Sequence, residues 1–417
     1  MSEKKHFKRV LAAGLIGNIL EWYDFAVYGF FAATIAEQFF PSGNPTTSLI
    51  AAFGAFAAGF LMRPIGAIFF GRIGDKVGRK KMLFLSVMLM AIPTFIIGVL
   101  PTHSQIGISA AILMVLMRML QGLSVGGEYT GSIVFLIEHA PDHRRGFFSS
   151  FSMMGATLGI LLGSGFGALI TGLLTEAELA AWGWRIPFLV GISIGIIGFL
   201  IRRGLPETPA SEEKIEAPLK EAFTNHKKPM LQSIGLNIMG AVSFYIIFIY
   251  LATWLVQEVH ETKSEALDIN TISLFVLLIS APLFAMLSDK IGRKPMLIAG
   301  TILMAVLAYP LIWLMHHHVF WMILLGQSIF AIALSIFMST IPAFMTELFP
   351  ARVRASATSV SYNIPYALFG GTAPMVAVWL ISVTGNPDAI AGYIIVVSLL
   401  AFFIALTVKE TKGKPIH

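Results

Sequence analysis

Twelve long apolar runs divide this chain of 417 residues, and they constrain its fold more than any other feature. A helix needs about 20 apolar residues to cross the hydrocarbon layer of a membrane. Backbone groups at that depth must bond within their own segment, and the runs lack the ten-residue alternation of barrel strands. The sequence therefore predicts an all-α integral membrane protein with twelve transmembrane helices. The runs cover about 9–37, 48–71, 82–100, 106–137, 145–173, 185–204, 230–257, 266–287, 296–315, 319–347, 354–383 and 389–408.

The composition agrees with a membrane protein and excludes several other classes. Hydrophobic residues make up 56% of the chain and charged residues only 12%, too few to cover a soluble globule of this size. The formal charge of +6 lies in short clusters between apolar runs, as expected for a membrane orientation signal rather than a nucleic-acid surface. The chain has no cysteine, which excludes disulfides, thiolate catalysis and cysteine-ligated zinc.

The basic residues also predict an orientation. Nearly all of the 29 Lys and Arg residues fall in alternate loops and at the two ends of the chain. Positive charge marks the cytoplasmic side, so we expect both the N and the C termini in the cytoplasm. The first run lacks a cleavage site after a short hydrophobic core and is predicted to be a retained span rather than a signal peptide.

Two near-copies of one polar phrase indicate that the chain is duplicated. Residues 71–81 read GRIGDKVGRKK, and residues 285–295 read AMLSDKIGRKP. Two further pairs recur in the same order: a Glu-Pro-Arg set at 138–145 and 347–354, and a Glu-Thr pair at 207–208 and 410–411. Repeats in a fixed order predict two pseudo-symmetric six-helix bundles, an arrangement typical of alternating-access transporters. The predicted division is an N-terminal bundle at 1–204, a cytoplasmic linker at 205–228 and a C-terminal bundle at 229–417.

These repeated motifs, with Arg118 and the sequence PET at 206–208, resemble the major facilitator superfamily over essentially the whole chain. Within it, four segments resemble the metabolite:proton symporters: NILEWYDF at 18–25, FLMRPIG at 60–66, QGLSVGGEY at 121–129 and WGWRIPF at 182–188. That group includes proline/betaine, α-ketoglutarate and citrate permeases, and GGEYTG at 126–131 is most similar to the proline/betaine type. The resemblance implies solute uptake driven by protons and leaves the solute open. The chain ends soon after the last run, without the coiled coil of osmosensing carriers, so osmotic activation is not expected.

The resemblance also implies a charge network that closes the cytoplasmic gate. Asp75 and Arg79 are four residues apart and could pair on one turn of helix, and the second copy repeats them as Asp289 and Arg293. A plain membrane anchor is the alternative reading of these charges. We expect the network to include pairs within each Glu-Pro-Arg set, namely Glu138 with Arg145, and Glu347 with Arg354.

Ionisable residues at membrane depth are the strongest functional candidates, because each costs at least about 2.5 kcal/mol on insertion scales. Glu21 lies roughly 18 Å along the first helix from Arg9 by the helical rise, near the midplane. Asp24 follows one turn later, and we expect both acids on one stripe of that helix. Arg118 and Glu128 occupy the fourth helix. The predicted proton-coupling residues are Glu21, Asp24, Arg118 and Glu128. A static neutralised pair is the alternative for the two acids of the first helix. For Arg118 the alternative is a structural arginine that bonds helix carbonyls, and for Glu128 it is a ligand of the substrate ammonium.

The second half offers no deep acid or base and supplies aromatic and amide groups instead. Such groups could surround a quaternary ammonium by cation–π contacts or bond a carboxylate. The predicted substrate-binding residues are Asn18, Asp24, Phe25, Tyr28, Glu128, Tyr129, Tyr245, Tyr362 and Asn363. In the fifth helix, glycines recur every four residues from Gly155 to Gly167 and predict close packing, plausibly against a helix of the other half.

Together these features predict a proton-coupled symporter that imports a small zwitterion or organic acid by alternating access, with a proline- or betaine-like solute favoured. A dicarboxylate, α-ketoglutarate or citrate permease and an uncoupled facilitator or exchanger are the alternatives. The chain shows no nucleophile–base set, phosphate loop or metal-ligand spacing, so we expect neither an enzyme nor a metal site. No cofactor is expected besides the coupling proton. The expected partners are a small solute, protons and the lipid bilayer of a cell membrane, a bacterial inner membrane being favoured, with the monomer as the functional unit.

Overall fold

The computed structural model describes residues 15, 18, 19, 21–69, 79–126, 128–138, 140–203 and 218–414, and all regular elements within these ranges are helical. The elements are α2 (Ala32–Phe39), α3 (Pro45–Leu61), α5 (Arg79–Val99), α6 (His103–Ile106), α7 (Ile108–Ser124), α8 (Glu128–Glu138), η1 (Asp142–Arg144), α9 (Arg145–Leu173), α10 (Glu176–Ala181), η2 (Gly183–Arg185), α11 (Ile186–Arg203), α12 (Pro218–Asn225), α13 (Lys227–Tyr245), η3 (Ile246–Tyr250), α14 (Leu251–Gln257), α15 (Lys263–Ile291), α16 (Arg293–Met315), α17 (Phe320–Met338), α18 (Ile341–Glu347), α19 (Ala351–Pro365), η4 (Tyr366–Gly370), α20 (Ala373–Thr384) and α21 (Ala389–Thr407).

The helices follow the predicted apolar runs. Among the described residues, 9 helices are long and apolar enough to cross a membrane, and two shorter apolar helices, Leu85–Val99 and Gly183–Ile197, occupy the places of the third and sixth runs. The first run is described from residue 21 onward. It is helical to Phe39 apart from a turn at Phe31, through which the backbone hydrogen bonds continue.

Local signals explain where several helices begin and end. Asn44 accepts a hydrogen bond from the Thr46 backbone N–H at 2.9 Å and precedes Pro45, the first residue of α3. Thr262 and Glu265 form a capping box at the start of α15. Gly385, with φ of +62°, ends α20 in the left-handed conformation that glycine adopts without steric cost.

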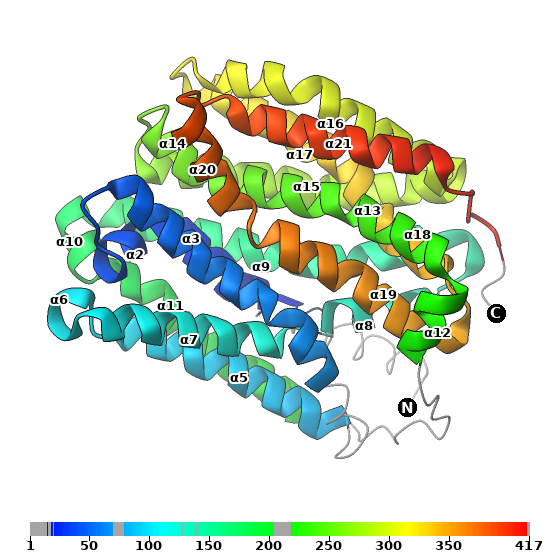
Figure 1. The fold of residues 1–417 in the computed structure, drawn as a ribbon, viewed down its shortest axis with the longest axis horizontal. Coiled ribbons are helices and arrows are strands. Elements are labelled where there is room, and N and C mark those ends of the chain that lie inside the picture. Colours follow the sequence, from blue (N-terminus) through cyan, green and yellow to red (C-terminus); the bar gives the residue numbers. More distant parts are fainter. Residues whose placement is uncertain are drawn as a thin grey trace.

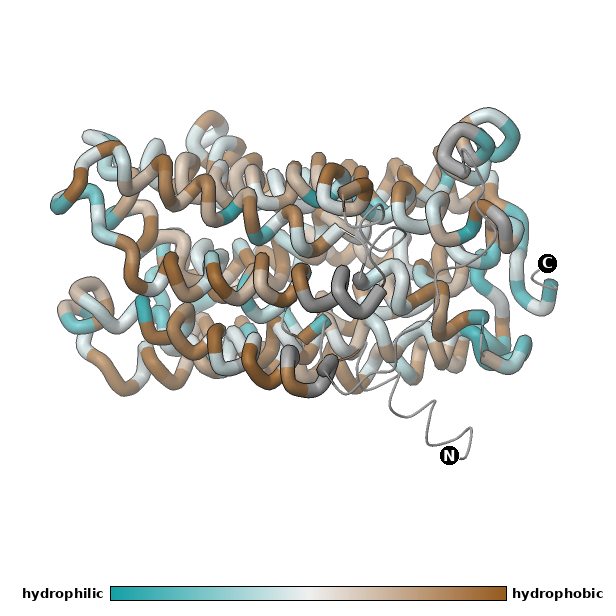
Figure 2. The backbone as a smooth tube through the Cα atoms, turned by 90° about the horizontal axis from the view of Figure 1, so that it is seen from below, coloured by the Kyte–Doolittle hydropathy of each residue, from teal (hydrophilic) through white to brown (hydrophobic). Residues whose placement is uncertain are grey.

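The two predicted halves lie on opposite sides of an elongated bundle. In Figure 1, α3, α5, α7 and α11 of the first half lie on one side, and α16, α17 and α21 of the second half lie on the other. Hydrophobic residues follow the lengths of the helices and hydrophilic ones gather mainly at the two ends (Figure 2). We call the end with α12 the linker end and the end with α6 and α10 the far end (Figure 1). The sequence prediction assigns the linker end to the cytoplasm.

The glycine stripe of α9 packs against both halves. A Cβ on Gly159 would lie 2.4 Å from the Ile19 carbonyl oxygen of the first helix, and one on Gly167 would lie 3.2 Å from Leu267 Cδ1 of α15, in the second half. The α9 helix also contacts α15 through Ser164, whose hydroxyl lies 3.2 Å from the Leu267 carbonyl oxygen. The last part of the predicted linker at 205–228 contains the helix α12, which packs on α19.

Candidate functional site

The centre of the bundle is marked by interrupted helices, which in transporters lie near substrate sites. The fourth predicted span breaks at Val125 and Gly126, between α7 and α8. Backbone packing requires glycine at position 126, because a Cβ there would lie 2.2 Å from the Ala67 backbone nitrogen. Asn363 of the second half donates a hydrogen bond of 2.9 Å to the Gly126 carbonyl oxygen. The break is therefore held by an amide from the opposite half.

Beside this break, a narrow cavity lies between the halves and is walled mostly by aromatic rings. The ring centroids of Tyr129 and Tyr362 are 4.7 Å apart, and those of Tyr362 and Tyr366 are 4.0 Å apart. Trp22 lies edge-on to Tyr129 at 5.9 Å and to Phe244 at 6.2 Å. We call this space the aromatic cavity, and its rings are Trp22, Tyr129, Phe244, Tyr362 and Tyr366. Both halves contribute to it.

A buried ion pair lies next to the aromatic cavity. Arg63 Nη2 is 2.9 Å from Glu21 Oε1, and the two residues are only 1% and 4% exposed. The guanidinium carbon lies 5.4 Å from the centroid of Trp22 and 4.9 Å from that of Phe60. Among the described residues, Arg63 Nε and Nη1 have no hydrogen-bond partner. The guanidinium therefore keeps N–H groups that are free to donate. A buried donor without an acceptor destabilises a protein by about 1–3 kcal/mol.

Asp24 belongs to a different buried cluster, inside the first half. Thr94 donates to Asp24 Oδ2 at 2.7 Å, and Gln121 donates to Thr94 Oγ1 at 2.7 Å. Arg118 in turn donates to Gln121 Oε1 at 2.7 Å and packs over the rings of Phe25 and Tyr28. This chain of bonds connects Asp24 to Arg118 without direct contact. Glu21 and Asp24 lie one helical turn apart, but each bonds to a different neighbour, Arg63 for Glu21 and Thr94 for Asp24.

Other predicted site residues are spread around these two clusters. Asn18 donates to Ser132 Oγ at 3.3 Å, and Tyr28 donates to the Ala52 carbonyl oxygen at 2.9 Å, so neither reaches the aromatic cavity in this state. Tyr245 stacks on Trp22 with a centroid separation of 6.4 Å. The side chain of Glu128 lies outside the described residues. Sequence reasoning missed Trp22, Phe244, Thr94 and Gln121, although Trp22 stands within the motif at 18–25.

Charged groups hold the two halves together at the linker end, with partners that differ from the prediction. Glu138 Oε1 accepts from Arg354 Nη1 at 2.9 Å, so this glutamate pairs across the halves and not with Arg145. Arg145 contacts Asp142 and donates to the Lys414 carbonyl oxygen at 2.7 Å. Glu347 pairs with Arg293 at 3.0 Å. Of these ion pairs, the one between Glu138 and Arg354 joins the two halves, whereas those of Arg145 with Asp142 and of Arg293 with Glu347 lie within one half. Asp75 and the side chain of Arg79 lie outside the described residues.

Asp289 shows how helix geometry contributes to this closure. Its carboxylate pairs with Arg293 at 2.8 Å and also accepts from the backbone N–H groups of Gly146 and Phe147 at 2.8 and 2.9 Å. Those two groups lie in the first turn of α9, in the other half. A helix N-terminus offers free N–H donors and a positive dipole end, so it stabilises a carboxylate. The second copy of the repeated phrase is thereby bonded to the first half.

The C-terminal segment adds a second carboxylate of this kind, next to α16. Burial alone would raise the pKa of Glu410, but hydrogen bonds from the backbone N–H groups of Lys412, Arg293, Lys294 and Thr411 outweigh it and lower the pKa below its usual value. The bonds from Arg293 and Lys294 are 2.9 and 3.0 Å long and cap the start of α16. Thr411 donates to Glu347 Oε2. The repeated Glu-Thr motif thus supports the charge network of the linker end.

Comparison with known proteins agrees with this geometry. Residues 10–211 match the family model for sugar and other transporters, and residues 233–416 match that of the Major Facilitator Superfamily. A glycine betaine/proline/ectoine/pipecolic acid transporter of Dickeya dadantii is 37% identical over 98% of this chain and 84% of its own length. A proline/betaine transporter of Escherichia coli K12 is 35% identical over 98% of this chain and 85% of its own length.

The fold is shared with solved structures as well. A crystal structure of a D-xylose–proton symporter superposes with a TM-score of 0.80 at 20% identity, covering 98% of this chain and 99% of the other. The shared fold confirms the twelve-helix fold predicted from the sequence. The relatives of similar sequence are transporters and not enzymes, which confirms the predicted transport function. The chain is a multi-pass membrane transporter that belongs to the major facilitator superfamily, within the family of the proline/betaine transporters.

Proposed function

We propose that this transporter imports a small zwitterion of the glycine betaine or proline type together with protons, by alternating access. The observation that carries this proposal is the aromatic cavity beside Arg63, because one place between the halves offers partners for both ends of a zwitterion. The names of the related transporters include the same solutes.

The aromatic rings suit the cationic end. A quaternary ammonium has no N–H donor, so it gains little from acceptors and is bound best by the faces of Trp and Tyr. Trp22, Tyr129 and Tyr362 supply such faces within the aromatic cavity. In this structure the rings contact one another, and we propose that they move apart to admit the ammonium group. A secondary ammonium such as that of proline would use the same faces and could also donate to a tyrosine hydroxyl.

Arg63 suits the carboxylate end. Its guanidinium already forms the pair with Glu21 and retains two nitrogens without a hydrogen-bond partner among the described residues. A fork of N–H donors fits a carboxylate in two-point contact. Solute binding would then give those buried donors an acceptor and recover part of their desolvation cost.

For the coupling proton, we propose Asp24 as the carrier and Arg118 as the group that adjusts it. Asp24 is 4% exposed and Arg118 is 0% exposed, and Thr94 and Gln121 connect them. Moving Arg118 toward Asp24 would favour the charged carboxylate, and moving it away would favour the protonated acid. Glu21 and Glu128 remain candidates from the sequence, and we favour Asp24 because Glu21 is already paired with Arg63.

Contacts at both ends suggest how access alternates. The linker end is closed by Arg354 with Glu138 and by Asp289 with the α9 N-terminus. At the far end, Lys263 of α15 donates to Thr34 Oγ1 of α2 at 3.0 Å, which also joins the halves. We propose that the cycle breaks one set of contacts at a time. Each set needs to contribute only a few kcal/mol to bias two states strongly.

One observation favours a second candidate, a dicarboxylate permease. Arg118 Nε and Nη2, like two nitrogens of Arg63, lack hydrogen-bond partners among the described residues, and two arginines could bind two carboxylates. The rings of Phe25 and Tyr28 stand against this reading, since they cover the Arg118 guanidinium at 4.5 and 4.3 Å. We further propose a bacterial inner membrane as the location and a functional monomer.

Counterflow in proteoliposomes tests the proposal. The purified protein is reconstituted into proteoliposomes that are loaded with unlabelled solute. The vesicles are then exposed to labelled glycine betaine, proline, α-ketoglutarate or citrate, with and without an imposed pH gradient. We expect exchange of glycine betaine and proline, and uptake that increases when the outside is acidic. Exchange of α-ketoglutarate or citrate alone would support the dicarboxylate reading, and uptake indifferent to pH would support an uncoupled facilitator.

A further inference from the structure

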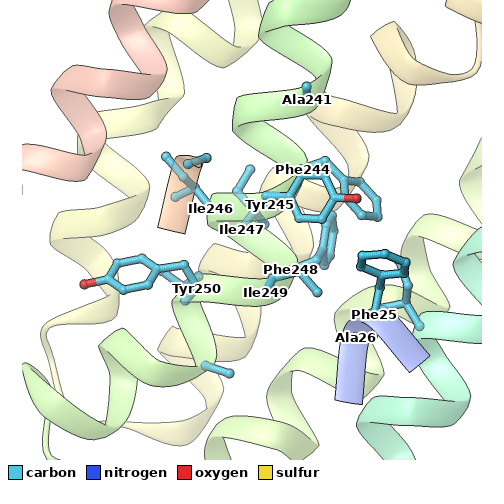
Figure 3. Close-up of a cluster of buried hydrophobic side chains, with 14 of the residues drawn as sticks. Phe25, Ala26, Ala241, Phe244, Tyr245, Ile246, Ile247, Phe248, Ile249 and Tyr250 are labelled. Carbon is cyan, nitrogen blue, oxygen red and sulfur yellow. The ribbon is translucent and has the colours of Figure 1, made fainter. Parts of the chain in front are cut away.

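A π-helical turn interrupts the seventh predicted span directly beside the aromatic cavity. The segment η3 follows α13 without a break, and the Leu251 backbone N–H bonds the Ile246 carbonyl oxygen, five residues earlier. A π turn widens the helix and leaves backbone groups outside the regular ladder, and such turns are frequent at functional sites. Phe244 and Tyr245, which precede the turn, belong with Phe25 to one buried hydrophobic cluster (Figure 3).

Two buried amides from neighbouring helices bind the carbonyl groups of this turn. Gln327 of α17 donates to the Ile247 carbonyl oxygen at 2.9 Å, and Asn270 of α15 donates to the Phe248 carbonyl oxygen at 3.2 Å. Gln327 also donates to Asn270 Oδ1 at 2.8 Å, so the two amides hold each other. Both residues are 0% exposed. Hydrogen bonds in such buried surroundings are strong, and a buried acceptor left without its donor destabilises the fold.

The same amides reach the opposite half. Asn270 donates to Ser164 Oγ of α9 at 3.1 Å, and Thr271 approaches the same hydroxyl at 2.8 Å. Ser164 therefore joins the first half to the residues that hold the π turn. When α9 and α15 separate, Asn270 loses this bond, and the geometry of the turn is free to change with it.

We propose that Asn270 and Gln327 are positioning residues, which hold the π turn η3 and thereby place Phe244 and Tyr245 against the solute. The reason is geometric. A π turn contains one residue more than an α-helical turn, so it rotates the side chains of α13 relative to those of α14 around the helix axis. Phe244 lies in the wall of the aromatic cavity, and Tyr245 stacks on Trp22 and lies edge-on to Phe60 at 5.0 Å. Neither amide lines the cavity, so their effect passes through the backbone. The inference rests on the proposed zwitterion site.

The test compares binding of glycine betaine and proline to purified full-length variants by intrinsic tryptophan fluorescence. Gln327→Met keeps the length of the side chain and removes both donors. The variant loses the hydrogen bonds to the Ile247 carbonyl oxygen and to Asn270 Oδ1. We expect its Kd for glycine betaine to rise about ten-fold and the ratio of the two Kd values to change. Ser335→Ala is the matched control: Ser335 lies on the same helix, is 0% exposed and has no hydroxyl partner among the described residues. Its Kd values should stay within about two-fold of wild type.

Other outcomes separate this inference from the function it rests on. A wild-type protein that binds neither solute refutes the proposed function and with it the inference. A wild type that binds both solutes, together with a Gln327→Met variant of unchanged Kd values, overturns the positioning role alone. A purely structural role would lower the melting temperature without altering the ratio of the two Kd values. If Gln327→Met does not fold, Asn270→Ser provides the same comparison, because it frees the Phe248 carbonyl oxygen and leaves Gln327 on Ile247.

Discussion

The two halves of this transporter share a fold and a repeat but differ in what they bring to the centre. The first half contributes charge at membrane depth, with Glu21, Arg63, Asp24 and Arg118 all almost fully buried. The second half contributes rings and amides: Tyr362, Tyr366, Asn270 and Gln327 are equally buried and carry no charge. The difference suggests a division of work, in which the first half handles the proton and the carboxylate and the second half shapes the wall around the ammonium.

The largest expected effect comes from removing the proposed proton carrier. Asp24→Asn keeps the size and the bond from Thr94 but cannot take up a proton. A difference of one pH unit supplies about 1.4 kcal/mol per proton, enough for roughly ten-fold accumulation. We expect gradient-driven accumulation of glycine betaine to disappear while counterflow continues. Asp268→Asn, which alters an exposed carboxylate of α15, should leave both unchanged. Accumulation by Asp24→Asn would exclude Asp24 as the proton carrier.

Substitutions at Arg63 test whether the buried charge of the first half binds the solute in addition to stabilising the fold. Arg63→Met leaves Glu21 buried without its arginine, which typically destabilises a protein by about 3–5 kcal/mol. The double variant Glu21→Gln/Arg63→Met should regain most of the lost thermal stability in detergent. It should still bind glycine betaine at least about ten-fold more weakly than wild type, because the carboxylate partner is gone. Restored binding in the double variant would show that the pair is only structural.

Tyr362 tests the aromatic contribution of the second half. Tyr362→Ala removes a ring face from the aromatic cavity, and we expect the Kd for glycine betaine to rise about ten-fold. Tyr362→Phe keeps the face and should change the Kd by less than about three-fold. Tyr309→Ala removes a ring that is 52% exposed on the outer surface and serves as the control. Equal losses in the alanine and phenylalanine variants would point to the hydroxyl rather than the ring.

A smaller effect is expected at the linker end, where the halves meet. Glu138→Gln weakens the pair with Arg354. Because the Glu138 side chain is 40% exposed, the free energy that holds the linker end closed should fall by only about 0.5–1 kcal/mol. The chain has no cysteine, so Thr157→Cys places a single reporter in the cavity wall. Labelling of this thiol from the linker end should increase about two- to five-fold in Glu138→Gln. Glu176→Gln at the far end is the control, and an unchanged rate would exclude Glu138 from the gate.

The smallest effect concerns Glu410. Its pKa in the folded state is lowered, so its contribution to stability is present above the unfolded-state pKa and is lost as the pH falls through the folded-state value. Glu410→Gln should therefore melt slightly below wild type near neutral pH, and the difference should vanish in acid. Melting curves in detergent across that range measure it. A difference that grows in acid would contradict the capping role.

The sequence predicts the helices and the two halves well, because apolar length and repeated motifs are local properties. Two of the predicted substrate-binding residues, Tyr129 and Tyr362, lie in the wall of the aromatic cavity. The partners of charged residues are harder to predict. Glu21 and Asp24 are three positions apart, which rotates them by about 60° around the helix and is enough to face different neighbours. Glu138 bonds Arg354 because two copies of a motif meet across the boundary between the halves. The π turn and its amides leave no pattern in the sequence that we recognise.

The charge movement that accompanies glycine betaine entry tests the central claim most directly. Glycine betaine carries no net charge, so its entry with a proton moves positive charge inward, and its entry alone moves none. Capacitive recordings from proteoliposomes adsorbed on a sensor should therefore show an inward positive current on adding glycine betaine, larger when the outside is acidic and absent in Asp24→Asn. Solute exchange without any such current in the wild type would contradict the account.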